Sequence, residues 1–240
     1  MTRRLPTVAL WLLAGHILLL ALFWALLQVP ESSIWMLGVS AALVLALTIV
    51  AGAVHGGAVV AWTSERPVGP SLLSGVRLVP AFLAGITLFV AIWFATAHLL
   101  HWHSHVAGQI DAWIIAKTGR TNTAWLHRSI FWIVQFLRWT MGLTLSLSLV
   151  ASFARVAPPS ARRSAWLRSA ARPSRWLEVT FWFVLLIAIP WQFAYWRPAR
   201  LPLAAEPWFV GAKLATIALA MSVGWALVLR AVTRPPRLSE

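Results

Sequence analysis

The sequence predicts an all-α membrane protein in which six transmembrane helices form three hairpins. Of the 240 residues, 60% are hydrophobic and only 11% are charged, whereas a soluble domain carries about 45–50% apolar and 25% charged residues. Six apolar stretches reach the roughly 20 residues that a helix needs to cross a hydrocarbon core of about 30 Å. Basic residues flank these stretches at alternate ends, as is typical of membrane proteins. Nucleic-acid binding is not expected, because the net charge of +14 forms no stripe on a soluble face.

We expect residues 1–240 to form a single integral membrane domain. The first span follows an arginine pair, but its apolar run exceeds the 7–15 residues of a signal peptide, so a retained helix is predicted. The second span either ends at Val54 or runs on to Trp62, through Gly56 and Gly57, which weaken a helix. Pro190 predicts a kink in the fifth span. The six spans cover Val8–Gln28, Ile34–Val54, Leu78–Leu99, Ser129–Phe153, Trp176–Trp196 and Trp208–Leu229.

The distribution of basic residues orients the predicted spans. Thirteen arginines fall on the side of the two chain ends, and five basic residues fall on the other side. The positive-inside rule places the richer side in the cytoplasm. We therefore expect a multi-pass protein of a bacterial inner membrane with cytoplasmic N- and C-termini. The chain has no cysteine, which excludes disulfides and thiolate metal sites.

Amphipathic stretches in three loops predict short interfacial helices. They cover Ser71–Arg77, Gln109–Lys117 and Ser160–Arg175, and Gly119 would end the second of them. Basic side chains on the third stretch can face anionic lipid headgroups, at about 1 kcal/mol each. This surface sets the topology, binds membrane lipids or docks a cytoplasmic protein partner. Its basic residues are Arg162, Arg163 and Arg168.

Two cations inside predicted spans are not explained by topology. Arg138 lies near the middle of the fourth span, where a charge costs at least about 2.5–3.5 kcal/mol. At 1.5 Å per residue, Gln135, Gln192 and Lys213 lie at a similar depth in the outer half of the membrane. One hypothesis is that an external anion binds these four residues, because the arginine fork suits phosphate. The alternative is that Arg138 bonds to carbonyls and amides in the bundle while Lys213 extends toward the interface.

Histidines offer a different hypothesis, a metal site. If the third helix continues past its span, His98, His101 and His105 share one face, and imidazoles spaced in this way can bind zinc or copper. Interfacial packing is the alternative, because histidine beside tryptophan is ordinary at a helix end. Haem is not expected inside the bundle, because His16 falls in the middle of the first span while His55 falls at the cytoplasmic end of the second.

Enzyme motifs are absent, and carboxylates are scarce. The sequence has no Walker loop and no Gly-x-Ser-x-Gly elbow. None of the six acidic residues lies near a span centre, where coupled transporters place one, and Glu178 is expected to form a structural ion pair. The sequence favours a non-enzymatic component, without a cofactor, that binds or moves an amphipathic or anionic molecule. The alternatives are a membrane-embedded metalloenzyme that uses the histidine cluster, and a structural subunit that docks a partner.

Overall fold

The computed structural model describes residues 4–30, 33–64, 67–119, 124–154, 171–196 and 206–234. Within these ranges the secondary structure is helical, without a strand. Six helical segments are long and apolar enough to span a membrane. The prediction of an all-α, multi-pass membrane protein is therefore confirmed at this level.

The helices follow the predicted spans closely at some positions and depart from them at others. Five long helices are α1 (Arg4–Leu27), α2 (Ile34–Thr63), α4 (Val79–Thr118), α5 (Ala124–Ala154) and α9 (Glu206–Thr233). A short helix α3 (Val68–Leu73) and a 3-10 turn η1 (Ser74–Leu78) join α2 to α4. The fifth predicted span is divided into α7 (Pro173–Phe183), the π-helix η2 (Val184–Ala188) and α8 (Ile189–Tyr195).

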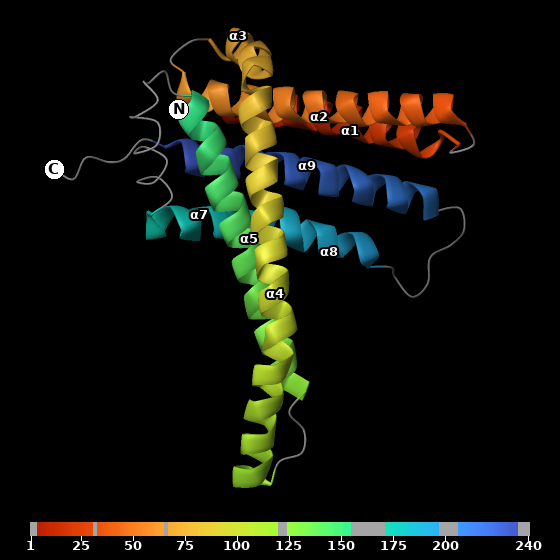
Figure 1. Cartoon of the computed structure of the whole chain (residues 1–240). Helices are drawn as coiled ribbons and strands as arrows, with labels where there is room; N and C mark the ends of the chain where they lie inside the picture. Colours follow the sequence, from red (N-terminus) through yellow and green to blue (C-terminus); the bar gives the residue numbers. More distant parts are fainter. Residues whose placement is uncertain are drawn as a thin grey trace, which may run out of the picture.

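The α4–α5 hairpin runs across the remaining helices (Figure 1). Helices α2, α1, α9 and the α7–α8 segment lie side by side, and each contacts the next. The hairpin packs against α2, α9 and α7, and its lower part extends past them. Helix α1 thus contacts α2, α4 contacts α5, and the α7–α8 segment contacts α9, but the predicted arrangement of three membrane-spanning hairpins is not confirmed.

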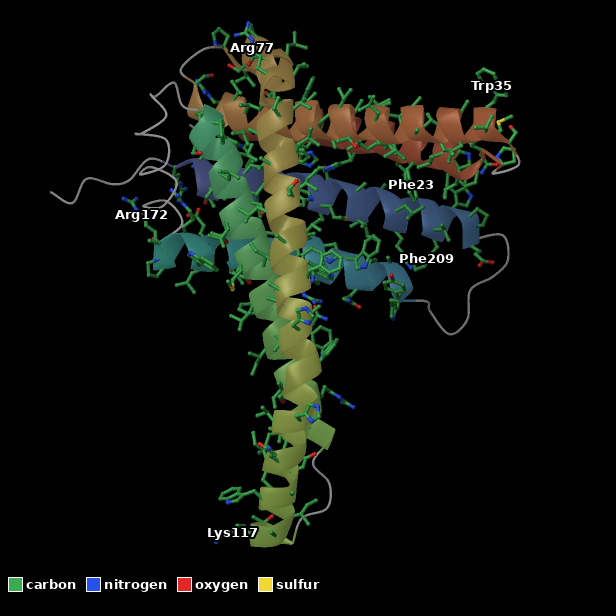
Figure 2. All side chains as sticks on the ribbon, in the orientation of Figure 1. Phe23, Trp35, Arg77, Lys117, Arg172 and Phe209 are labelled. Atoms are coloured by element: carbon green, nitrogen blue, oxygen red, sulfur yellow. The ribbon has the colours of Figure 1, made fainter. Side chains whose placement is uncertain are left out.

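Charged and aromatic side chains mark three extremities of the molecule (Figure 2). Arg172 lies at the end where α1 begins and α9 finishes, which we call the basic end. Trp35 and Phe209 lie at the opposite end of the same helices, and Lys117 lies at the tip of the α4–α5 hairpin. Large apolar side chains cover the outer faces of the helices, including Trp35 and Trp208, each 83% exposed. Such a surface is suited to lipid rather than water.

Helix α2 continues well past the predicted end of the second span. It runs to Thr63 instead of Val54, and both Gly56 and Gly57 lie buried inside it. A Cβ atom on Gly57 or Gly75 would overlap backbone atoms of the facing segment. The glycines therefore let η1 approach α2 closely, and the tertiary contact outweighs their low helix propensity. The predicted stretch Ser71–Arg77 thus forms α3 and η1, with Ser71 and Leu72 buried against the bundle.

Helix α4 is 40 residues long, about 60 Å at 1.5 Å per residue. The predicted interfacial segment Gln109–Lys117 is part of this one continuous helix, so a separate interfacial helix there was a wrong prediction. The helix ends at Gly119, which adopts a left-handed conformation with φ of 65°. A glycine stop at this position was predicted, and it is confirmed. Because the hydrocarbon core is about 30 Å thick, half of α4 suffices to cross it.

Candidate functional site

Arg138 is the buried charge at the centre of the α4–α5 hairpin, and its side chain is 5% exposed. Its Nε donates a hydrogen bond to Thr96 Oγ1 at 2.9 Å, and its Nη2 donates to the Trp93 carbonyl at 3.1 Å. Its Nη1 lies 3.5 Å from Gln135 Oε1, and the guanidinium stacks 4.0 Å from the centroid of the Trp93 ring. All of these partners are electrically neutral. The guanidinium is therefore hydrogen-bonded while its charge has no carboxylate partner among the described residues.

A lateral groove with a volume of about 840 Å³ lies beside Arg138, between α5 and the α7–η2–α8 segment. Trp93 and Gln135, which both contact the guanidinium, form part of its wall. The wall is otherwise mostly aromatic and aliphatic, and several of its side chains are open to the surroundings, including Trp132 at 61% exposed. The lining residues are Trp93, Phe131, Trp132, Gln135, Phe136, Trp139, Thr140, Thr180, Phe183, Val184, Ala188, Ile189 and Gln192.

The irregular segment η2 forms one wall of the lateral groove. Pro190 has no backbone N–H and its ring clashes with the preceding helical turn, and the π-helix Val184–Ala188 ends two residues before it. The predicted disturbance at Pro190 is thus a wide helical turn. Thr180 donates to Thr140 across the groove at 3.3 Å, which ties α7 to α5. Turns of the π type recur at functional sites.

The structure brings two of the four predicted anion-binding residues into the lining of this groove. Gln135 and Gln192 both line it, and Arg138 lies behind Gln135. Lys213 is placed elsewhere: its Nζ donates to the Trp196 carbonyl at 2.7 Å and lies 5.9 Å from the Phe193 ring centroid. Lys213 therefore binds the exposed carbonyl at the end of α8, a favourable position for a cation.

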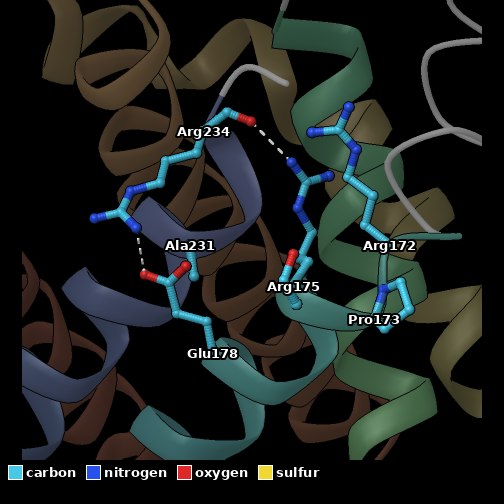
Figure 3. Close-up of a pocket in the computed structure, with 7 residues that line it drawn as sticks. Arg172, Pro173, Arg175, Glu178, Ala231 and Arg234 are labelled. Carbon is cyan, nitrogen blue, oxygen red and sulfur yellow. Dashed lines mark hydrogen bonds and ion pairs between the residues drawn. The ribbon is translucent and has the colours of Figure 1, made fainter. Parts of the chain in front are cut away.

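A second cavity, the basic pocket, opens at the basic end between α7 and α9 (Figure 3). It has a volume of about 460 Å³ and is lined by Arg172, Pro173, Ser174, Arg175, Glu178, Ala231 and Arg234. Arg234 pairs with Glu178 at 2.9 Å, while Arg175 donates to the Arg234 carbonyl at 2.8 Å. The expected ion pair of Glu178 is present, with Arg234 as its partner. Three guanidinium groups beside one carboxylate make the pocket suitable for an anionic group.

The predicted histidine cluster lies on the projecting part of α4. His98 and His105 are exposed, and the side chain of His101 is outside the described residues. Within the described part of the chain, no three histidine, aspartate or glutamate side chains gather closely enough to hold a metal ion. The arginines of the predicted surface helix, Arg162, Arg163 and Arg168, also lie outside the described residues.

A pair of histidines that the sequence placed at different depths meets inside the bundle. His16 Nε2 lies 3.5 Å from His55 Nε2, and the two ring centroids are 5.4 Å apart. The prediction that His16 and His55 lie at different depths was wrong, because α2 continues to Thr63, which places His55 within the helix rather than at its end. Trp11 Nε1 donates to the Val54 carbonyl at 2.9 Å, and this bond sets the register of α1 on α2. The signal available in the sequence was one histidine inside the first span and one directly after the predicted end of the second.

Comparisons with known proteins add no relative to these observations. No protein-family model, no curated protein and no solved structure matches this chain.

Proposed function

We propose that this protein binds an amphipathic molecule with an anionic head group in the lateral groove. The single observation that carries the proposal is the groove itself, a cavity of about 840 Å³ with an apolar aromatic lining, polar groups at Gln135 and Gln192, and the Arg138 charge behind one wall. Sites for small ligands usually combine a largely apolar lining with a few placed polar groups. The protein acts as a binding or transfer component rather than as an enzyme.

The lining supports a ligand with a long apolar part. Phe136, Trp132 and Ile189 line the groove and are 49%, 61% and 55% exposed. In a membrane these side chains face lipid, so a hydrocarbon chain can enter sideways from the bilayer. Aromatic rings offer large rigid surfaces against which such a chain packs. Acyl and polyprenyl chains fit this description.

Arg138 supports a negative head group on the ligand. Its partners Thr96, Gln135 and the Trp93 carbonyl are neutral, so its positive potential is not cancelled locally. In a low-dielectric environment a charge acts over a longer distance than in water. A phosphate or carboxylate that hydrogen-bonds to Gln135 and Gln192 would lie within this field, with the amides as donors. Lys213 is not needed for this site.

The charge distribution supports an orientation for the proposed function. We propose that the protein lies in a bacterial inner membrane with the basic end in the cytoplasm, because arginines prefer that side. Gln192 precedes the α8 terminus by a few residues, far from Arg172 at the basic end. The ligand would therefore bind from the outer half of the bilayer.

A groove-filling variant tests this proposal. In nanodiscs that contain both phosphatidylglycerol and neutral lipid, we expect the purified wild type to retain phosphatidylglycerol in native mass spectrometry. Ala188→Trp should weaken this retention roughly tenfold, equivalent to about 1.4 kcal/mol, because Ala188 lines the groove. The matched control is Leu185→Trp, since Leu185 belongs to the same π-helix, is 42% exposed and does not line the groove.

The variant Arg138→Gln distinguishes recognition of the anionic head group from binding of the apolar part of the ligand. We expect this variant to keep binding lipid but to lose its preference for phosphatidylglycerol over the neutral lipid. Equal retention by Ala188→Trp and Leu185→Trp would contradict the groove as the binding site. An unchanged lipid preference in folded Arg138→Gln would contradict the role of the arginine.

A further inference from the structure

Three helices bring a polar chain of side chains into the bundle, away from the lateral groove. His16 comes from α1, His55 from α2 and Ser222 from α9. Ser222 is fully buried, and His16 Nδ1 lies 3.2 Å from its Oγ. Ionisable residues within membrane helices are costly and usually mark a functional site. We call this group the two-histidine site.

The partners of the two rings determine where their lone pairs point. His55 Nδ1 lies 2.9 Å from the Ala51 carbonyl oxygen, and because a carbonyl only accepts, this nitrogen carries the hydrogen. Ser222 donates its single hydroxyl hydrogen to the Ala218 carbonyl at 2.8 Å. The hydroxyl oxygen therefore accepts from His16 Nδ1. In each neutral ring the remaining nitrogen, Nε2, then has a lone pair and no hydrogen.

Two lone pairs thus face each other at 3.5 Å, an arrangement that a cation between them would stabilise. We propose that His16 and His55 bind a first-row transition-metal ion through their Nε2 atoms. Two nitrogens at 2.0–2.1 Å from an ion with trigonal, three-ligand geometry are about 3.5 Å apart, which matches the observed separation. A hydrogen bond with a nitrogen donor is normally 2.7–3.2 Å long, shorter than this contact.

The contacts on the far side of each ring match those of metal-binding histidines. Such histidines usually donate their second N–H to a carbonyl or another oxygen, which fixes the tautomer and the ring orientation. The Ala51 carbonyl and the Ser222 hydroxyl occupy these positions. Phe82 stacks on His55 at 5.5 Å, and Trp225 meets it edge-on at 5.6 Å. These rings hold the imidazole in place and keep bulk water out.

Monovalent copper is the ion that this environment favours. Imidazole nitrogens suit copper and zinc, and burying a charge without an anionic partner becomes more costly as the charge rises. Among the described residues no third histidine or carboxylate joins the pair, so the remaining ligand is external. A cavity of about 230 Å³ borders His55 and provides space for it, and the hydroxyl of Ser146 lines this cavity without a hydrogen-bond partner.

Metal titration of the purified protein tests the proposal independently of lipid binding. With Cu⁺ kept reduced, or with Zn²⁺, we expect about one high-affinity ion per chain by elemental analysis, with Cu⁺ bound more tightly. His16→Gln and His55→Gln should each weaken this binding at least tenfold. Ser222→Ala keeps both ligands but removes the partner of His16, and it should weaken binding by 10–100-fold.

The exposed histidines His98 and His105 supply matched controls. His98→Gln and His105→Gln change the same residue type, and we expect both variants to bind copper as the wild type does. Loss of the ion in these two variants, with retention in folded His16→Gln and His55→Gln, would overturn the proposal and place the metal on α4. A wild type that binds no ion would also overturn it. If no ion binds, we expect nitrogen NMR of the wild type to show a hydrogen bond between two neutral rings, from His16 Nε2 to His55.

Discussion

At the scale of single residues, Arg138 illustrates how a charge is accommodated in an apolar hairpin. Its planar fork reaches a hydroxyl on Thr96, an amide on Gln135 and the Trp93 carbonyl, and it also stacks on the Trp93 ring. Each hydrogen bond to a charged group contributes roughly 1.5–3 kcal/mol. The burial cost is thus offset locally, and a ligand can use the charge without being required for folding.

Replacing Arg138 by lysine should destabilise the protein even though the charge is kept. A lysine ammonium is a compact group that cannot donate in the directions of a planar fork or stack in the same way. We expect Arg138→Lys to lower the free energy of unfolding by about 2 kcal/mol, measured by denaturant titration in detergent. Lys213→Arg is the control, because Lys213 makes one bond near a helix end, and its effect should stay within about 0.5 kcal/mol. Equal stability of Arg138→Lys and the wild type would contradict this account.

Helical rise predicted a similar depth for Arg138, Gln135 and Gln192, and the two glutamines do line one groove. The same arithmetic could not place Lys213, whose side chain reaches along the helix to the Trp196 carbonyl. Helical rise gives the depth of a residue in the membrane, but it gives neither its lateral position in the bundle nor the direction of its side chain. The two-histidine site was missed for another reason: the depth of His55 depended on an end of α2 that was predicted too early.

At the scale of helices, apolar length predicted where spans occur better than where helices end. Hydropathy measures the affinity of a segment for lipid, whereas α4 continues beyond its apolar part to Thr118, because no proline interrupts the helix within His98–Lys117. The opposite error occurred in α2, where glycine propensity was overruled by packing against η1. A π-helix before Pro190 leaves no trace in composition. These features depend on contacts between helices, and the sequence of one segment does not reveal such contacts.

The packing of η1 on α2 predicts opposite effects for two glycine-to-alanine substitutions. A Cβ on Gly75 would overlap the backbone of α2 around Gly57, and overpacking of this kind costs about 1–3 kcal/mol. Gly38 lies on α2, like Gly57, but a Cβ added to Gly38 would have no neighbouring atom within 4 Å. Gly38→Ala should therefore stabilise the protein by about 0.5–1 kcal/mol. Melting temperatures of both purified variants check the signs. A neutral Gly75→Ala would mean that η1 does not rest on α2.

At the scale of the whole molecule, the crossed hairpin limits how the protein can sit in a bilayer. Helices α1, α2, α9 and α7–α8 share one direction, and the α4–α5 hairpin crosses them (Figure 1). If the hairpin lay within the bilayer along its whole length, Lys117 and Arg128 would be placed in hydrocarbon. Each charge there costs at least about 2.5–3.5 kcal/mol. We therefore expect the tip to emerge into water and the apolar part of α4 up to His98 to cross the bilayer at a tilt.

Single cysteines can test this arrangement cleanly, because the chain contains no native cysteine. With the proposed orientation, a membrane-impermeant maleimide added to intact cells should label Lys117→Cys at the hairpin tip and Ser33→Cys before α2. Ser174→Cys at the basic end should react only in inverted vesicles. Ile86→Cys is the matched control, since Ile86 lies on the apolar part of α4 and its 41% exposed side chain would face lipid, where the reagent does not reach. Failure of Lys117→Cys to react from either side would mean that the tip is embedded, and labelling of Ser174→Cys in intact cells would reverse the orientation.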